Sequence, residues 1–346
     1  MKQIEITKPD DWHVHFRDDE MLKAVVPETS RHFARAIVMP NLIPPILSEN
    51  DAIQYKKRIM DAIPSKDNFV PLMTLYLTEK TNKTDLKRAF LNKSVLAAKL
   101  YPAGATTNSD SGVKDLSKIM HILEIMCEIE MPLLIHGEVT NNEVDIFDRE
   151  KEFIEKKLNF ICRELPELKI TLEHITTSDA VNYINEANKN VVASITPHHL
   201  ALNRNALLAG GIKPHNYCLP VLKREYHRQA LVKAAISGSS KYFLGTDSAP
   251  HLKEDKENAC GCAGVFNATT CISILAEIFD RENAIEKLED FVSINGAKHY
   301  GFNINKEKIK ITKTKNPLSF QHSLNVKNEE VIIFQPDFPV FWETQI

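Results

Sequence analysis

Histidines and an aspartate end short apolar runs of this sequence, where their side chains could meet at one rim of a fold. They are His13, His15, His136, His174 and Asp247. Residues i and i+2 of a strand share a face, so His13 and His15 could bind one ion. A lone His-x-His pair is more often two polar residues on the solvent face of a strand. The further donors favour a metal centre instead, because imidazole and carboxylate groups in this number suit a pair of zinc ions.

Lys99 is the unusual member of this set, because a protonated amine would repel metal ions. It lies in the apolar run 95–101, and burial in such a run favours the neutral amine. A neutral amine can react with carbon dioxide to give a carbamate, whose two oxygens could bridge two metals. The alternative is a lysine paired with a neighbouring carboxylate.

Positioning these residues at one rim requires strands that end there. Short apolar segments recur along the chain, and each is followed by a stretch long enough for a helix. The segments are 11–14, 36–40, 70–77, 95–101, 133–136, 170–174, 191–196 and 242–245. This alternation predicts an α/β fold, a (β/α)8 TIM barrel with its site at the carboxyl ends of the strands. An open doubly wound sheet is the alternative, but the 11 glycines form no phosphate-binding cluster.

The charge and composition of the chain indicate what kind of partner it binds. The 346 residues carry a formal net charge of −3 and no long basic block, so we expect a small-molecule partner rather than nucleic acid or a membrane. No apolar run is long enough to span a bilayer, and residues 1–5 lack the apolar core of a signal peptide, so we expect a cytoplasmic protein. The six cysteines are dispersed, which suits reduced thiols. Cys260-Gly261-Cys262 lacks the spacing and the second pair of a zinc knuckle.

Motifs in order along the chain carry a specific resemblance. They are PDDWHVHFRD (9–18), AIVMPNL (36–42), AAKLYP (97–102), PLLIHGEVT (132–140), DIFDRE (145–150), EHITT (173–177), YCLP (217–220), LGTDSAPH (244–251) and CGCAG (260–264). With these motifs the chain resembles the amidohydrolase superfamily, and within it the single-function bacterial dihydroorotases. Phe16 and Gly104 depart from the common pattern at positions that are not expected ligands.

The resemblance implies a binuclear zinc centre. His13, His15, Lys99 and Asp247 would bind one zinc, with Lys99 bridging as a carbamate. His136 and His174 would bind the second zinc together with that carbamate, and a hydroxide would lie between the two ions.

The resemblance also implies substrate-binding residues. Arg17, Asn41 and His251 would hold the ring carboxylate, and backbone groups of Leu219 and Ala263 would contact the pyrimidine edge. The metal-site residues His15 and His136 would also face the substrate. On the residues alone, Arg17 and Asn41 could equally be a surface ion pair and a loop turn, and His251 could be an exposed loop residue. Thr106 and Thr107 belong to the small, polar segment 103–112, which has the composition of a mobile lid. A passive loop is the alternative there.

The implied reaction is the reversible cyclisation of N-carbamoyl-L-aspartate to L-dihydroorotate plus water, the third step of UMP synthesis, in a homodimer. Asp247 would carry the proton between the attacking water and the ring nitrogen. One alternative is a hydantoinase or allantoinase, which would share the metals but would not bind a substrate carboxylate through Arg17 and Asn41. Another is a metal-free scaffold, which should lack a ligand, and none is missing here.

The chain is expected to be one barrel domain over 1–346, with a less recognisable segment at about 305–346. Little of that segment matches the family motifs. We expect it to be surface decoration, because residues 306–315 are basic and lead into a polar region.

Overall fold

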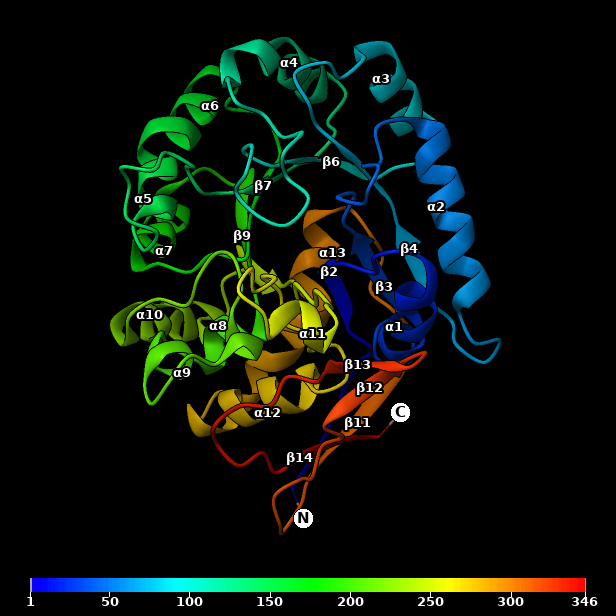
Figure 1. Cartoon of the computed structure of the whole chain (residues 1–346), viewed down its shortest axis with the longest axis vertical. Coiled ribbons are helices and arrows are strands. Elements are labelled where there is room, and N and C mark those ends of the chain that lie inside the picture. Colours follow the sequence, from blue (N-terminus) through cyan, green and yellow to red (C-terminus); the bar gives the residue numbers. More distant parts are fainter. Residues whose placement is uncertain (1, 346) are drawn as a thin grey trace.

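The computed structural model describes residues 2–345 of the chain. Parallel strands form its centre and helices surround them (Figure 1). The central strands are β2 (Asp10–Val14), β3 (Arg35–Val38), β4 (Val70–Leu72), β5 (Thr74–Tyr76), β6 (Ala97–Leu100), β7 (Leu133–His136), β8 (Ile170–Glu173), β9 (Val191–Ile195) and β10 (Tyr242–Leu244). Most of these strands are buried along their whole length, as expected for a parallel sheet covered on both faces.

The strands close into the expected barrel. β2, β3 and β4 are paired in that order, and β5 to β10 follow in chain order. The segment predicted as one strand over 70–77 is interrupted at Met73, so that its first half pairs with β3 and its second half with β6. The barrel closes between its first and last strands, where His15 N donates to Ser248 O at 3.0 Å and Asp247 N donates to His13 O at 2.9 Å.

Helices follow the strands, and several of them have a polar N-cap residue. The longer ones are α1 (Asp19–His32), α2 (Glu49–Ala62), α3 (Lys83–Leu91), α4 (Met120–Glu128), α7 (Ser178–Glu186), α10 (Glu225–Ile236) and α12 (Cys271–Arg281). The shorter ones are α5 (Arg149–Phe153), α6 (Asn159–Glu164), α8 (Pro197–Ala201), α9 (Asn205–Leu208), α11 (Lys253–Lys256) and α13 (Asn295–His299). Ser48 and Asp51 form a reciprocal cap at the start of α2, which satisfies backbone N–H groups that the helix leaves unpaired. No helix within residues 2–345 is both long and apolar enough to cross a bilayer.

Aromatic side chains fill the amino-terminal end of the barrel. Trp12 is 1% exposed and stacks on Tyr300 with ring centroids 4.9 Å apart. The Arg35 guanidinium lies 4.9 Å from the Phe302 ring centroid and pairs with Asp10 at 2.6 Å. Because this end is packed and its charges are paired, the carboxyl end is the one left for chemistry.

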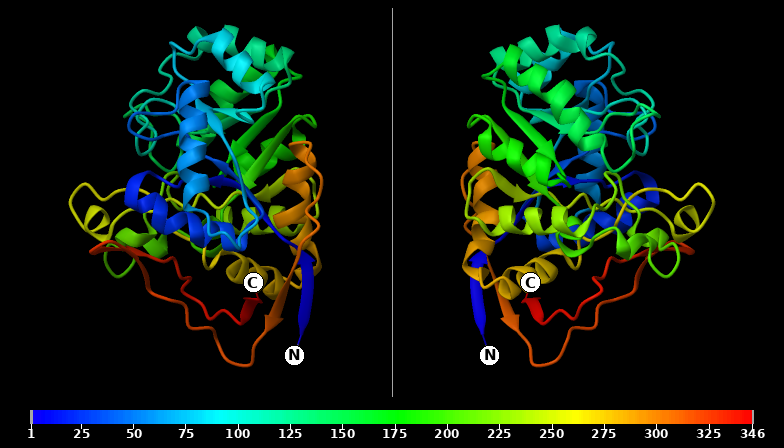
Figure 2. Two further views of the ribbon diagram at one scale, coloured as in Figure 1. Left: turned by 90° about the vertical axis from the view of Figure 1, so that its right-hand side faces the viewer. Right: turned by 90° about the vertical axis from the view of Figure 1, so that its left-hand side faces the viewer.

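The expectation that the C-terminal segment is surface decoration is wrong. β11 (Lys308–Lys313) lies between β1 (Gln3–Thr7) and β14 (Trp342–Gln345) in an antiparallel sheet, and Figure 2 shows these strands side by side below the barrel. β12 (Ser323–Val326) and β13 (Glu329–Ile332) form a hairpin. Trp342 is 0% exposed, so the segment is a packed part of the fold. Its apolar residues are separated by polar ones, which hid this role in the sequence.

Candidate active site

The first and last barrel strands bring three of the expected ligands together. His13 Nε2 lies 3.2 Å from His15 Nε2, and Asp247 Oδ1 lies 3.2 Å and 3.1 Å from these two nitrogens. All three side chains are buried. Burial lowers the pKa of His15 to about 4, which favours the neutral form that binds metals. Two imidazole nitrogens and a carboxylate oxygen this close require a cation or shared protons between them, so the donor set fits a metal ion.

The other expected histidines complete the rim from β7 and β8. The ring centroids of His136 and His174 are 4.7 Å apart, and those of His13 and His174 are 5.1 Å apart. Burial lowers the pKa of His174 well below its usual range. Its Nδ1 is buried and has no hydrogen-bond partner among residues 2–345, which leaves a lone pair available to a ligand.

Lys99 lies in the floor of this group and is fully buried. Burial lowers the pKa of its amine, as the carbamate hypothesis requires. Its Nζ contacts Glu173 Oε2, so the alternative expectation, a lysine paired with a carboxylate, describes the contact in this structure. The same Glu173 carboxylate also lies beside His13, so it connects Lys99 to the histidine cluster.

Glu173 is a site residue that the sequence reasoning missed. Its Oε1 lies 3.0 Å from His13 Nδ1, which turns His13 Nε2 toward His15 and Asp247. Burial alone would lower the pKa of His13, but the Glu173 and Asp247 carboxylates raise it to about 9. A carboxylate behind a histidine ligand is the usual partner that orients the ring. A buried acid at the end of an apolar strand was the available signal.

Two further carboxylates were also missed, of which Glu138 faces a histidine ring and Asp11 binds the backbone. Glu138 Oε2 lies 2.7 Å from His136 Nε2. Asp11 accepts hydrogen bonds from the backbone N–H groups of His13 at 3.1 Å and Thr246 at 2.8 Å, and from the Thr246 hydroxyl at 2.6 Å. It therefore joins the two strands that carry His13 and Asp247.

Left-handed backbone conformations occur at three of the expected site residues. Arg17, His174 and Asp247 have φ angles of 58°, 42° and 45°, a region that non-glycine residues occupy at a cost. Hydrogen bonds to the backbone of each residue hold it there, and all three side chains line the site cavity.

The expected carboxylate-binding residues meet at one side of the rim. Arg17 Nη2 lies 2.9 Å from His251 Nε2, and Arg17 Nε donates to Pro250 O at 3.1 Å. The same His251 nitrogen lies 3.0 Å from Ala263 O, so its tautomer decides whether it accepts from Arg17 or donates to Ala263. Leu219 lines the same cavity.

The segment 103–112 lies over this cavity. Asn41 Nδ2 donates to Thr107 O at 2.9 Å, and Thr107 Oγ1 donates to Ala263 O at 3.3 Å. Thr106 and Thr107 both line the cavity, which measures about 20 Å³, little more than a water molecule needs. This volume is too small for a ring-sized ligand, and the lid expected at this segment stays a prediction.

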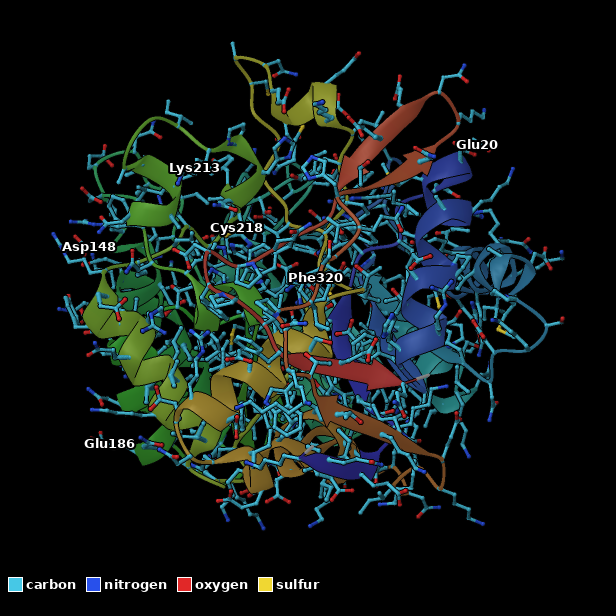
Figure 3. All side chains as sticks on the ribbon, turned by 90° about the horizontal axis from the view of Figure 1, so that it is seen from below. Glu20, Asp148, Glu186, Lys213, Cys218 and Phe320 are labelled. Carbon is cyan, nitrogen blue, oxygen red and sulfur yellow. The ribbon has the colours of Figure 1, made fainter. Side chains whose placement is uncertain are left out.

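A second group of potential ligands is partly engaged in internal hydrogen bonds, although His198 Nε2 is buried with no hydrogen-bond partner among residues 2–345. His198, His199 and Cys218 lie close together and are buried, and Cys218 is labelled in Figure 3. Both ring nitrogens of His199 are used, one at 2.7 Å from Thr196 Oγ1 and the other at 2.9 Å from Pro220 O. We therefore assign no metal to this group.

The closed barrel and the gathered histidines, aspartate and lysine define a hydrolase of the amidohydrolase class. The model of the amidohydrolase family matches residues 10–314.

Two similar proteins indicate which group of amidohydrolases the chain belongs to. The chain is 54% identical to the dihydroorotase of Rhizobium meliloti (strain 1021) over 342 residues, which cover 99% of each chain. It is similar to the solved structure of dihydroorotase from Saccharomyces cerevisiae in complex with 5-fluoroorotic acid, with a TM-score of 0.90 and 32% identity, over 100% of this chain and 99% of that one. The chain thus belongs to the amidohydrolase family, among its single-function dihydroorotases, and the expected family is confirmed.

The same comparison weighs against the hydantoinase alternative. The L-hydantoinase of Arthrobacter aurescens aligns over 98% of this chain and 87% of its own, with a TM-score of 0.78 but 14% identity. That likeness shows a shared fold alone. The similarity to the Rhizobium enzyme also reaches through the C-terminal segment, where the motif comparison found little to match.

Proposed function

We propose that this protein catalyses the reversible cyclisation of N-carbamoyl-L-aspartate to L-dihydroorotate and water, as a cytoplasmic homodimer. The observation that carries this proposal is full-length similarity to dihydroorotases combined with the grouping of Arg17, Asn41 and His251 beside a cluster of metal ligands. A guanidinium and an amide suit a ring carboxylate, which hydantoin and allantoin lack.

Two zinc ions would occupy the rim. His13, His15 and Asp247 would hold one, His136 and His174 the other, and a Lys99 carbamate would join them. When bound, such ions would lower the pKa of a water to about 7, far below that of bulk water, and polarise a carbonyl. The orphaned His174 Nδ1 and the close contact between His13, His15 and Asp247 support this occupancy.

Asp247 would carry the proton. Burial alone would raise the pKa of its carboxyl, but the neighbouring His13 and His15 hold that pKa well below its usual range. The ionised carboxylate can therefore accept the proton of the attacking water and deliver it to the ring nitrogen as the C–N bond breaks. The cyclising direction uses the same group in reverse.

The remaining residues would hold the ring. Arg17, Asn41 and His251 would bind its carboxylate, and the backbone groups of Leu219 and Ala263 would contact its amide edge, with His15 and His136 facing it from the metal side. Thr106 and Thr107 would close over the bound molecule, because the cavity they line is too small to admit it otherwise.

The test is metal content together with hydrolysis of L-dihydroorotate by the purified protein, with hydantoin and allantoin as competing substrates. We expect about two zinc ions per chain and a clear preference for L-dihydroorotate. Asp247→Ala should lower kcat by at least about 10³-fold, because it removes both a ligand and the proton carrier. Protein that holds no zinc and opens no ring, or an Asp247→Ala variant with near-normal turnover, would reject the proposal.

A further inference from the structure

Lys256 ends helix α11 and is buried without a carboxylate partner. It is 4% exposed, and it forms no salt bridge with any acidic residue in 2–345. Its Nζ instead donates to three backbone carbonyl oxygens, those of Tyr217 at 3.1 Å, Cys262 at 2.9 Å and Gly264 at 2.5 Å. An ammonium group has three hydrogens to donate, so each of them is used.

The three carbonyls belong to the two segments that carry Leu219 and Ala263. Gly264 N donates to Tyr217 O at 3.0 Å, so the segments 217–220 and 260–264 are joined directly as well as through Lys256. A side chain at Gly264 would bring a Cβ within 2.5 Å of Ala249 O, which shows how closely the backbones pack here. Without the ammonium, three carbonyls would lose a donor in a buried setting, which is costly.

The same linkage reaches the other residues expected to bind substrate. Ala263 O faces His251 Nε2 at 3.0 Å and Thr107 Oγ1 at 3.3 Å. A shift of the segment 260–264 would therefore move the backbone of Ala263, which is expected to contact the substrate ring. It would also move the oxygen to which Thr107 donates, and Thr107 belongs to the expected lid.

We propose that Lys256 is a positioning residue for substrate binding, whose ammonium group fixes the backbone of Leu219 and Ala263 against the ring. This inference rests on the proposed function, because the ring is what those backbone groups face. Lys256 lies behind these segments and does not touch the metal ligands.

The charge of Lys256 changes within an accessible pH range. Burial lowers the pKa of its amine to about 8, and the Arg17 guanidinium lowers that pKa further against the opposing influence of Cys218 and Cys262. Burial raises the pKa of Cys218 to about 12 and also raises that of Cys262. Of these neighbours, Lys256 alone loses charge near pH 8. The neutral amine has two hydrogens for three carbonyls, so the segments should loosen as pH rises through this range.

The experiment compares kcat and KM for L-dihydroorotate across about pH 6.5 to 9.5 in the native zinc-loaded protein and in three variants. In the unmodified protein we expect KM to rise about tenfold above pH 8 relative to pH 7, the equivalent of one lost hydrogen bond, while kcat changes less. Lys256→Arg should remove the rise, because a guanidinium keeps its charge throughout. Lys256→Met should have a high KM at every pH. Lys253→Met, in the same helix but more exposed, should follow the unmodified protein.

Several results would overturn the inference. They are a KM that stays flat through pH 8 in the unmodified protein, a Lys256→Arg variant that keeps the alkaline rise, or a folded Lys256→Met variant whose kcat falls while KM stays unchanged. If Lys256→Met does not fold, the comparison of the unmodified protein with Lys256→Arg still decides. Failure of the unmodified protein to open L-dihydroorotate at any pH would instead reject the proposed function.

Discussion

At the scale of residues, two of the four histidines at the rim have a carboxylate behind them. His13 has Glu173 and His136 has Glu138, at 3.0 Å and 2.7 Å. These acids fix which nitrogen of each ring faces the centre of the rim, and they make that nitrogen more basic. The metal affinity of the site should therefore depend on residues that do not themselves touch a metal.

Glu173→Gln tests this dependence. The amide keeps the shape of the side chain but loses the charge that faces His13, so we expect zinc affinity to fall by about 10- to 100-fold. Zinc retained after dialysis against graded chelator concentrations measures the effect. Glu186→Gln, an exposed substitution on α7, is the matched control. Equal zinc retention in the two variants would show that Glu173 does not support the centre.

The sequence predicts those site residues whose side chains are typical metal ligands. The sequence predicts these roles because several donors end apolar runs together and lie in the family motifs, and the structure brings them together at the rim. The residues are His13, His15, His136, His174, Lys99 and Asp247. Glu173, Glu138 and Asp11 were missed, because a carboxylate beside a histidine in sequence does not reveal which way it faces. Lys256 gave no signal either, since its partners are backbone carbonyls of distant segments.

At the scale of elements, apolar runs located the barrel strands but not their irregularities. The run 70–77 gave one expected strand and forms two, because β3 and β6 pair with different halves of it. The C-terminal strands were missed because β11 alternates exposed and buried residues, a pattern that a basic surface segment shares. Their burial depends on β1, from the other end of the chain.

The segment 103–112 is expected to close over the substrate, and a substitution in it tests this role. Thr107→Ala removes the hydroxyl that donates to Ala263 O, which should weaken the closed position by about 0.5–1.5 kcal/mol. We expect kcat/KM for L-dihydroorotate to fall by roughly 2- to 13-fold as a result. Ser111→Ala, in the same segment and exposed, should leave it unchanged. Steady-state kinetics decide, and equal values in both variants would make the segment a passive loop.

At the scale of the whole molecule, we predict that barrel and C-terminal segment unfold as one unit over 1–346. Trp342 is 0% exposed, and its indole N–H donates to Asp280 on α12 at 3.2 Å. Trp342→Ala should therefore lower the free energy of unfolding by about 3–5 kcal/mol. Gln345→Ala, an exposed change in the same strand, should have little effect.

Thermal unfolding followed by calorimetry measures both variants. A single transition that moves to lower temperature in Trp342→Ala agrees with one unit. A separate early transition, with the barrel unfolding at its usual temperature, would divide the chain in two.

The sheet formed by β1, β11 and β14 also has a consequence for how the protein is made. β1 is synthesised long before β11, the strand it pairs with. During translation β1 must wait with its backbone N–H and C=O groups bonded to water, and the edge it offers could pair with another nascent chain. The sheet of β1, β11 and β14 can therefore form only after β11 and β14 have been synthesised.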